Sequence, residues 1–230
     1  MLRFDIITIF PKIFDSYLNE SILKRALKKK LISFKTHNTR AFAKNKHKTV
    51  DDKPYGGGAG MIQMVEPILR AVQRVNSKFQ IPNSKKKVII LSAKGRQFTQ
   101  KTAQKWAKLN QLILISGRYE GIDERVRIAL KAEEISIGPY VLTDGDVAAM
   151  AIISAITRLV PGAINFSSLK EESHTELPFM EARGLEYPHY TRPEVLTYKG
   201  RKYRVPKILL SGHHKKIGEW RKKHQKSLEK

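Results

Sequence analysis

Two short apolar runs, separated by a helical segment, constrain the fold more than any other feature of this chain. Residues 88–92 read VIILS and residues 112–116 read LILIS, and both runs have the length and composition of a buried strand. The segment between them, TQKTAQKWAKLN at 99–110, has the composition of a helix. A strand, a helix and a strand at this spacing predict a βαβ unit with parallel strands, and therefore an α/β fold.

The same alternation continues on both sides of this unit. Apolar runs bounded by turn residues predict more strands, and segments with helical spacing predict more helices. The strands are predicted at residues 4–10 and 133–138, and the helices at 11–30, 123–132 and 147–162. We therefore predict one α/β domain that covers residues 1–162.

The composition changes after Gly162. Residues 163–184 are polar and aperiodic, which is typical of a linker or a mobile loop. From Lys199 to Lys230 the chain holds twelve Lys or Arg against two Glu, and residues 215–225 have helical spacing. We predict an interdomain linker at 163–172 and a small, basic, helical domain at 173–230.

The charge and the missing cysteines limit the function. Forty-four Lys plus Arg against 21 Asp plus Glu leave a net charge of +23, which favours a polyanionic partner over general basicity. The absence of cysteine excludes disulfides, thiolate catalysis and zinc–thiolate sites. The start of the chain lacks the features of a signal peptide, and the longest apolar run, 147–156, is too short to cross a bilayer. We expect a cytoplasmic protein that does not use a membrane.

Glycine-rich turns follow three of the predicted strands. They read LSAKGR at 91–96, SGRYEGID at 116–123 and SIGPYVLTDGD at 136–146. Because ligands of open α/β sheets bind outside the carboxyl ends of the strands, these turns predict one site for an adenosine-like ligand. A fourth glycine-rich segment, PYGGGAGM at 54–61, is neither a P-loop nor a dinucleotide-binding fingerprint.

Three of these glycine-rich segments, together with a motif near residue 190, carry a specific resemblance. PYGGGAGM, SGRYEGIDERV, SIGPYVLTDGD and EYPHYTRPEV occur in this order, and VDDKPYGGG and LLSGHH agree with them. They resemble the bacterial tRNA (guanine-N1)-methyltransferases, the TrmD family, and the match runs nearly end to end. The resemblance implies the SPOUT fold, a parallel sheet whose carboxyl-terminal part forms a trefoil knot, a rare feature in proteins.

The resemblance also implies an activity and an assembly. The family transfers a methyl group from S-adenosylmethionine to N1 of the guanosine just 3′ of the anticodon in tRNA, which helps to maintain the reading frame. Its members are homodimers whose active site is shared between the catalytic domain of one subunit and the carboxyl-terminal domain of the other. Activity depends on a divalent ion, so Mg²⁺ is implied, although the sequence shows no ligand cluster for a metal.

The chemistry of this reaction requires a base and a cation. Guanine N1 carries a proton at neutral pH, so a carboxylate must take that proton while a cation holds the charge that builds on O6. By resemblance Arg158 is the cation, although its position alone would also suit an arginine that binds carbonyls at a helix end. The base matches Glu172, where the family has aspartate, with Glu171 as the alternative; without the resemblance both read as solvated linker acids.

The guanine and the methyl donor have their own candidate residues. Glu120 could accept hydrogen bonds from guanine and so distinguish it from adenine, Arg118 would order the ligand or the RNA, and Gly57 and Gly58 would border the base. The donor site implied by the family comprises Leu91, Ser92, Ala93, Gly117, Tyr119, Gly121, Ser136, Ile137, Gly138, Tyr140, Val141, Leu142, Gly145 and Ala149.

Three positions depart from the family pattern near these sites. Asp144 stands where the family usually has glycine, Pro139 where an acid is common, and Ala59 where proline is usual. Other residues have structural interpretations: Asp123 and Glu124 predict a helix cap, and His213–His214 predict a helix start because no third metal ligand accompanies them.

Two other functions compete with this assignment. One is a methyltransferase of the same fold with a different RNA target, and the other is a basic RNA-binding protein without activity. The second would explain the charge and the basic segments YKGRKYRVPK and WRKKHQK, which resemble a phosphate-contact surface. It would not explain why acids gather in the glycine turns of a basic protein.

Overall fold

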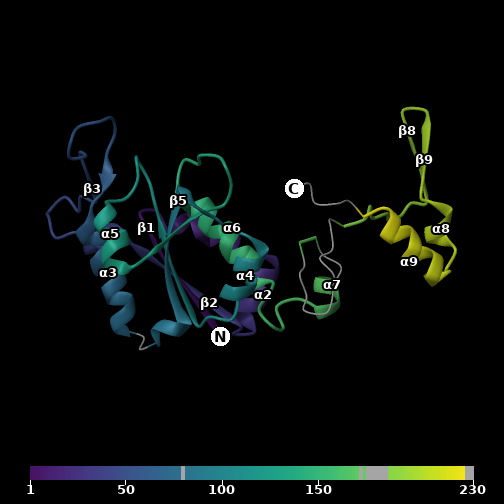
Figure 1. Ribbon diagram of the computed structural model, residues 1–230, viewed down its shortest axis with the longest axis horizontal. Coiled ribbons are helices and arrows are strands. Elements are labelled where there is room, and N and C mark those ends of the chain that lie inside the picture. Colours follow the sequence, from purple (N-terminus) through teal and green to yellow (C-terminus); the bar gives the residue numbers. More distant parts are fainter. Residues whose placement is uncertain (79–80, 171–172, 175–185, 226–230) are drawn as a thin grey trace. The chain divides into compact units, whose positions relative to one another are not determined.

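The computed structural model describes residues 1–78, 81–170, 173–174 and 186–225 (Figure 1). It divides into two compact units, Met1–Phe166 and Ser167–Lys230. Glu171 and Glu172, the two candidates for the catalytic base, lie outside the described residues.

The first unit is built on one parallel five-stranded sheet with the strand order β2-β1-β6-β5-β7. The predicted βαβ unit is confirmed, since β5 and β6 are parallel neighbours. All six residues of β6 are buried, which explains why its sequence is an unbroken apolar run rather than an alternating one. The strands are β1 Leu2–Thr8, β2 Ile32–Asn38, β5 Lys86–Gln97, β6 Gln111–Ser116 and β7 Glu133–Ser136.

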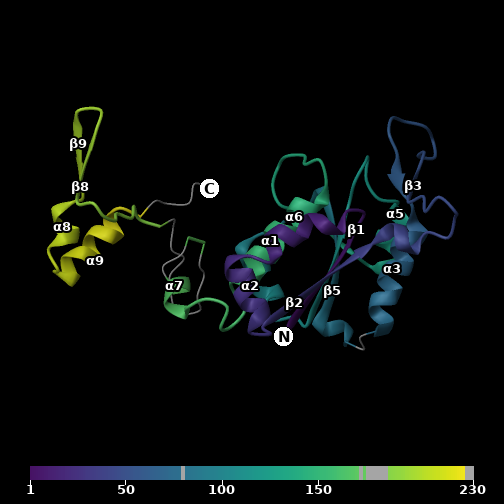
Figure 2. The ribbon, with the colours of Figure 1, turned by 180° about the vertical axis from the view of Figure 1, so that it is seen from behind.

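Helices cover both faces of this sheet, as Figures 1 and 2 show. One face packs against α2 Ser21–Lys28, α4 Gln100–Trp106 and α6 Gly145–Thr157, in a core that includes Trp106 and Phe4. The other face packs against α3 Val65–Lys78 and α5 Glu124–Leu130, in a second core around Val72 and Ile113. The sheet and its two helical layers therefore form the scaffold that holds the loops at the strand ends.

Strand β5 is longer than the sequence predicts and pairs with β7 twice. Ile135 of β7 is paired with Leu91 and again with Arg96, with a register shift between the two. Residues 92–95 of β5 have no partner in β7 between these two pairings, so the ladder has a bulge-like irregularity there. The polar residues 93–97 carry no apolar pattern, because their pairing rests on the backbone rather than on buried side chains.

The helix predicted at residues 11–30 is divided into three pieces. They are the 3-10 helix η1 Pro11–Phe14, α1 Asp15–Leu18 and α2. The second break falls at Glu20, which is extended, and Ser21, which has a φ of 49°. Two more 3-10 turns, η2 Thr39–Phe42 and η3 Asn83–Lys85, lie in loops.

A small antiparallel ladder, β3 Asp51–Asp52 with β4 Ile62–Gln63, closes the base of the glycine-rich loop 54–61. Gly56, Gly57, Gly58 and Gly60 all have positive φ, a conformation that other residues rarely adopt. The glycines of this segment are therefore required by the path of the loop itself.

The second unit contains helices and a hairpin. Its final helix, α9 His214–Lys223, confirms the predicted helix near the end of the chain and begins at the histidine pair. The stretch predicted as a linker contains a short helix, α7 Phe166–Lys170, and α8 Lys207–Leu210 precedes α9. The region predicted as a small, basic, helical domain also contains strands that the sequence did not predict: β8 Val195–Tyr198 and β9 Arg201–Arg204 form an antiparallel hairpin.

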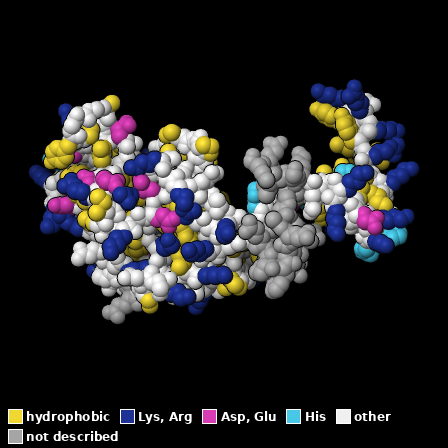
Figure 3. All heavy atoms as spheres, in the orientation of Figure 1, with side chains coloured by type: hydrophobic (Ala, Val, Ile, Leu, Met, Phe, Trp, Pro, Cys, Tyr) yellow, Lys and Arg dark blue, Asp and Glu magenta, His cyan; other side chains and the backbone are white. Residues whose placement is uncertain are grey.

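The turn of this hairpin explains why it forms. Lys199 has a φ of 48° and Gly200 a φ of 75°, the positive values that two-residue hairpin turns require. Leu196, Tyr198 and Tyr203 lie on one side of the ladder, and Lys202 and Arg204 on the other. Figure 3 shows hydrophobic side chains along one edge of the hairpin and basic side chains along its tip and other edge.

No helix in the described parts of the chain is long and apolar enough to cross a membrane.

Candidate functional site

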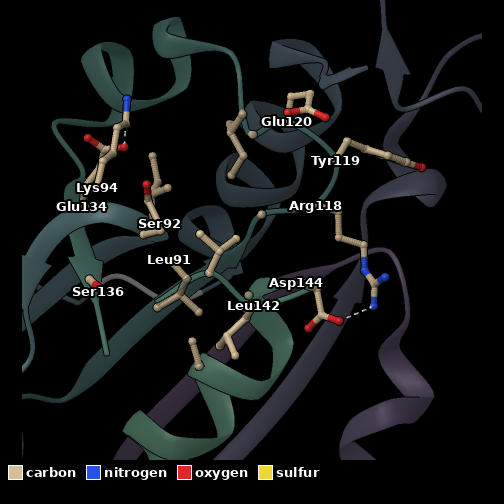
Figure 4. A pocket seen from close by; sticks show the side chains of 18 of the residues that line it. Leu91, Ser92, Lys94, Arg118, Tyr119, Glu120, Glu134, Ser136, Leu142 and Asp144 are labelled. Carbon is tan, nitrogen blue, oxygen red and sulfur yellow. Dashed lines mark hydrogen bonds and ion pairs between the residues drawn. The ribbon is translucent and has the colours of Figure 1, made fainter. Parts of the chain in front are cut away.

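A cavity of about 440 Å³ lies at the carboxyl ends of β5, β6 and β7 (Figure 4). Its walls come from residues 90–94 of β5 and from the two glycine-rich turns that follow β6 and β7. The turn predicted at 91–96 belongs to β5 in the structure, so that part of the prediction is wrong. The lining residues are Ile62, Arg127 and Ala148 together with the segments 90–94, 117–124, 134–137 and 140–145.

Most residues proposed for the methyl donor line this cavity. Gly138 and Ala149 are not among the described lining residues. Ala149 is fully buried in the core, and the carbonyl oxygen of Gly138 accepts a hydrogen bond from Ser136 Oγ at 2.8 Å. The proposed donor residues that line the cavity are Leu91, Ser92, Ala93, Gly117, Tyr119, Gly121, Ser136, Ile137, Tyr140, Val141, Leu142 and Gly145.

Close backbone contacts fix the floor of the cavity. The amide nitrogen of Gly145 donates to the carbonyl oxygen of Gly117 at 2.8 Å. A Cβ at Gly145 would lie 2.9 Å from the amide nitrogen of Gly117 and 3.1 Å from the Cβ of Leu91. Only glycine allows α6 to start this close to the ends of β5 and β6, so Gly145 shapes the cavity through its missing side chain.

Arg118 lines the cavity, and two aspartates anchor its guanidinium. Its Nη2 donates to the carboxylates of Asp144 and Asp146, at 3.1 Å each, and its guanidinium carbon lies 4.3 Å from the ring centre of Phe10. Asp146 is fully buried and also accepts a hydrogen bond from Thr8 Oγ1 at 2.8 Å. The network joins the ends of β1 and β6 to the start of α6, and Figure 4 shows the Arg118 side chain directed toward Asp144.

Sequence reasoning did not identify Asp146 or Thr8 as part of the site. The available signal was the pair of acids in TDGD at the start of a helix, which alone indicates only a cap. Asp144 does cap α6, since its Oδ1 accepts from the amide of Asp146 at 2.8 Å and from that of Val147 at 3.4 Å. The departure at position 144 therefore has a structural role in this chain, as helix cap and as partner of Arg118.

Glu120 lies against the glycine-rich loop. Its amide donates to the carbonyl of Met61 at 3.0 Å, and a Cβ at Gly60 would lie 2.6 Å from its Oε1. The loop that holds Gly57 and Gly58 is thus placed beside Glu120, although these two glycines are not among the described residues lining the cavity. Figure 4 shows the side chains of Arg118, Tyr119 and Glu120 diverging from one turn.

Acidic groups outnumber basic ones around the cavity. Five carboxylates and three cations line it: Glu120, Asp123, Glu124, Glu134 and Asp144, with Lys94, Arg118 and Arg127. The predicted cap of α5 is confirmed, because Asp123 accepts from the amide and the guanidinium of Arg125. The side-chain hydrogen bond from Arg125 is the main reason why the pKa of Asp123 lies below its ordinary value.

Arg158 lies away from this cavity within one chain. It is the carboxyl cap of α6, whereas the cavity is lined by the first residues of that helix. The helix has 13 residues. Ala148 is the last described residue of this helix that lines the cavity, and Arg158 follows it by ten residues, so the two are about 15 Å apart along the helix. The described residues contain no group of three or more His, Asp or Glu side chains that could hold a metal ion.

Comparisons with known proteins identify the family of this chain. A family model described as "tRNA (Guanine-1)-methyltransferase TrmD" matches residues 2–230. A "tRNA (guanine-N(1)-)-methyltransferase" of Thermomicrobium roseum is 51% identical over 221 residues, which are 96% of this chain and 78% of that protein. Proteins of the same name from Chloroflexus aggregans and Clostridioides difficile are 49% and 47% identical; the matches span 96% of this chain and 82% and 91% of those proteins. The chain belongs to the TrmD family of tRNA (guanine-N1)-methyltransferases.

Proposed function

We propose that this protein transfers a methyl group from S-adenosylmethionine to N1 of the guanosine immediately 3′ of the anticodon in tRNA. The carrying observation is a nucleoside-sized cavity at the carboxyl ends of β5, β6 and β7, in a chain about half identical to proteins named for this activity. The reaction takes place in the cytoplasm, where tRNA is used in translation.

The chemistry of the cavity suits the methyl donor. S-adenosylmethionine supplies an electrophilic methyl group on a positively charged sulfur. Leu91 and Leu142 offer apolar contact to a planar base, and the turns at Gly117 and Gly121 offer backbone groups for polar atoms. The excess of carboxylates in the lining favours a cationic ligand over a phosphate-bearing one, which distinguishes this cavity from the rest of a very basic chain.

Guanine recognition and proton removal are assigned to three side chains. Glu120 accepts hydrogen bonds from the Watson–Crick edge of guanine, and its position beside the loop of Gly57 and Gly58 supports this role. The carboxylate of Glu172 takes the N1 proton, and the guanidinium of Arg158 stabilises the charge that develops on O6. The roles of Glu172 and Arg158 rest on the family resemblance.

Arg118 orders the turn that carries Glu120. Its guanidinium is held by Asp144 and Asp146, and its side chain is 22% exposed. A cation held this firmly fixes the backbone of residues 117–121 before the ligand arrives, and a site arranged in advance loses less entropy on binding.

We infer that the active protein is a homodimer with shared active sites. Arg158 lies about 15 Å along α6 from Ala148, which lines the cavity of its own chain, so the cation at that cavity would come from a second copy. Exposed apolar side chains support such an assembly: Val147 on α6 and Phe10, Ile13 and Tyr17 on the adjoining η1–α1 segment. A second copy would cover this patch, which water otherwise surrounds.

We also propose the trefoil knot for the carboxyl-terminal part of the sheet. Strand β5 pairs with β7 in two registers, on either side of residues 92–95, and Phe98 donates to the carbonyl of Ser136 at 2.7 Å. This close approach of β5 to β7 supports the proposal, and the knot itself rests on the family resemblance. Basic segments of the second unit, including Lys199–Arg204, supply phosphate contacts for the anticodon arm. Mg²⁺ remains an expectation from the family alone.

The reaction is tested with two tRNA transcripts that differ only in having G or A just 3′ of the anticodon. Wild-type protein should methylate the G transcript alone. Glu172→Gln should reduce the single-turnover rate about 10²- to 10⁴-fold, the usual contribution of a general base. Glu171→Gln is the matched control, since it removes the same charge from the neighbouring residue.

The possible results separate the alternatives. Loss of transfer in Glu171→Gln, with activity kept in Glu172→Gln, would move the base by one residue. Donor binding without transfer to either transcript would favour an enzyme with another RNA target. Well-folded protein that binds tRNA but not S-adenosylmethionine in calorimetry would favour the non-enzymatic RNA-binding protein.

A further inference from the structure

A second hollow, of about 290 Å³, lies at the sheet edge near α4 and has the opposite chemistry to the donor cavity. It is lined by Lys87, Arg96, Lys101, Thr102, Lys105, Trp106 and Glu133. Glu134 lines the donor cavity, and Glu133, the residue before it on β7, lines the hollow. The two sites therefore take adjacent residues of one strand.

Two of the four cations in this hollow are fixed by its single carboxylate. Lys87 Nζ donates to Glu133 Oε2 at 2.8 Å, and Arg96 Nη2 donates to Glu133 Oε1. Arg96 also donates to the hydroxyl of Thr102 at 3.3 Å. Burial raises the pKa of Glu133, but the hydrogen bonds from Lys87 and Arg96 outweigh it, so the net pKa lies below its ordinary value. Glu133 is therefore ionised and holds both cations at the hollow.

The other two cations, Lys101 and Lys105, form no ion pair with any acid of the described residues. They are exposed and stand four residues apart on α4. Like charges at this spacing destabilise a helix, so an anion bound between the two lysines would relieve their repulsion. Four cations and one carboxylate line the hollow, which leaves an excess of three positive charges. The ring of Trp106, which is 1% exposed, forms a rigid base.

We propose that this hollow binds a phosphate group of the tRNA backbone, outside the cavity assigned to the methyl donor. Lys101 and Lys105 neutralise the phosphate, while Arg96 and Lys87 present further donors from the rigid strand pair. The open shape of the hollow and its side chains suit a phosphodiester that passes over the surface. The inference rests on the proposed function, because it assumes that tRNA is the substrate.

The test compares two double variants that remove the same charge from exposed lysines with the same spacing. One is Lys101→Gln with Lys105→Gln on α4, and the control is Lys24→Gln with Lys28→Gln on α2. tRNA affinity is measured against salt concentration. The α4 variant should bind about tenfold more weakly at physiological salt, with a salt slope smaller by about 1 to 2, because each phosphate contact contributes close to one unit. The control should change the slope much less.

Glu133→Gln provides a test of opposite sign. The variant keeps the positive charge of all four cationic residues and removes the carboxylate that competes with phosphate for Lys87 and Arg96. tRNA should therefore bind more tightly and with a steeper salt dependence. The rate of methyl transfer at saturating tRNA should be unchanged in the α4 variant, and its KM for tRNA should rise. Equal behaviour of the α4 variant and its control would overturn the proposal.

A second measurement separates RNA from free phosphate. Inorganic phosphate, added at constant ionic strength, is tested for its effect on the melting temperature of wild type and of the α4 variant. Stabilisation of wild type alone, with unchanged tRNA binding in the variant, would overturn the RNA assignment and leave a site for free phosphate. Wild-type protein that methylates no tRNA would contradict the proposed function, whereas normal methylation with no difference between the variants would contradict only this inference.

Discussion

The two compact units of this chain keep their apolar side chains in different places. In the first unit two buried clusters fill both faces of the sheet. In the described part of the second unit, Tyr187 is the single buried apolar residue, while Tyr198, Tyr203 and Leu210 are about half exposed. The first unit is therefore stabilised by its own core, and the second leaves its aromatic and apolar groups available to a partner.

Local contacts between rings and cations replace a core in the second unit. The guanidinium of Arg221 lies 4.8 Å from the ring centre of Tyr187, and the rings of Trp220 and His224 are stacked at 4.1 Å. Contacts of this kind contribute less than the burial of a large side chain in a packed interior. Substitutions should therefore affect folding in the first unit and binding in the second.

The largest effect is expected from Gly95→Ala in the first unit. A Cβ there would lie 2.5 Å from the amide nitrogen of Ile135 and 2.6 Å from the carbonyl carbon of Glu134. These are backbone atoms of a paired strand and cannot move aside. The free energy of unfolding should fall by about 3 kcal/mol or more, measured by urea denaturation. A loss below about 1 kcal/mol would mean that β5 does not cross β7 this closely.

The apolar scaffold could be predicted from the sequence, but this crossing could not. Runs such as residues 112–116 indicate buried strands because side-chain burial itself leaves a pattern. The second pairing of β5 with β7 uses backbone groups of AKGRQ, and backbone pairing leaves no such pattern. The β8–β9 hairpin was missed for a related reason: its strands are exposed on both faces, and only Lys199–Gly200 indicated a turn.

The candidate site also has a part that the sequence predicts and a part that only the fold brings together. The glycine-rich segments after β6 and β7 predicted where the cavity would form, because parallel strands end at one edge of the sheet. The segment 91–96 also borders the cavity, but as part of β5 rather than as a turn. The network around Arg118 could not be predicted. Asp146 lies 28 residues from Arg118 along the chain, and Thr8, which donates to Asp146, lies 138 residues from Asp146. Only the fold brings these side chains together. The positions of Glu172 and Arg158 relative to the cavity in an assembly stay a prediction.

A smaller effect on the first unit is expected from Asp5→Asn. Asp5 is fully buried and accepts from Arg3, Gln111 and His37 at 2.7 to 2.8 Å. Removing its charge leaves Arg3 without its carboxylate and should cost about 2 to 3 kcal/mol at pH 7. Both proteins are compared by urea denaturation as the pH is lowered.

The pH dependence of this difference has a defined sign. Burial raises the pKa of Asp5, but the hydrogen bonds from His37, Arg3 and Gln111 together lower it below its ordinary value of 3.8. A lowered folded-state pKa gives stability that is complete above about pH 4 to 5 and is lost as pH falls through the folded pKa. The gap between wild type and Asp5→Asn should therefore narrow below about pH 4. A gap that widens in acid would contradict this account of the network.

In the second unit the expected effect moves from folding to binding. Tyr198→Ala with Tyr203→Ala removes two exposed rings from one side of the hairpin, so the free energy of unfolding of the first unit should change by less than about 0.5 kcal/mol. Base stacking on such rings contributes about 1 to 3 kcal/mol per base, so tRNA affinity should fall by about tenfold or more. Thr197→Ala, on the other side of the same strand, is the control. Equal tRNA affinity in both variants would show that the aromatic side does not contact RNA.

The smallest effect, and one of opposite sign, is expected from Gly218→Ala in α9. A Cβ at this position would meet no atom within 4 Å, and the residue lies inside a helix without positive φ. Alanine loses less conformational entropy than glycine in a helix, so the second unit should gain about 0.5 to 1 kcal/mol. The gain is measured by hydrogen exchange of the α9 amides, because global unfolding would follow the core of the first unit. The same chemical change, Gly to Ala, thus destabilises where backbone from two strands meets and stabilises where a helix faces solvent. Protection of α9 that stays the same or falls would mean that this helix surface is already packed against another part of the assembly.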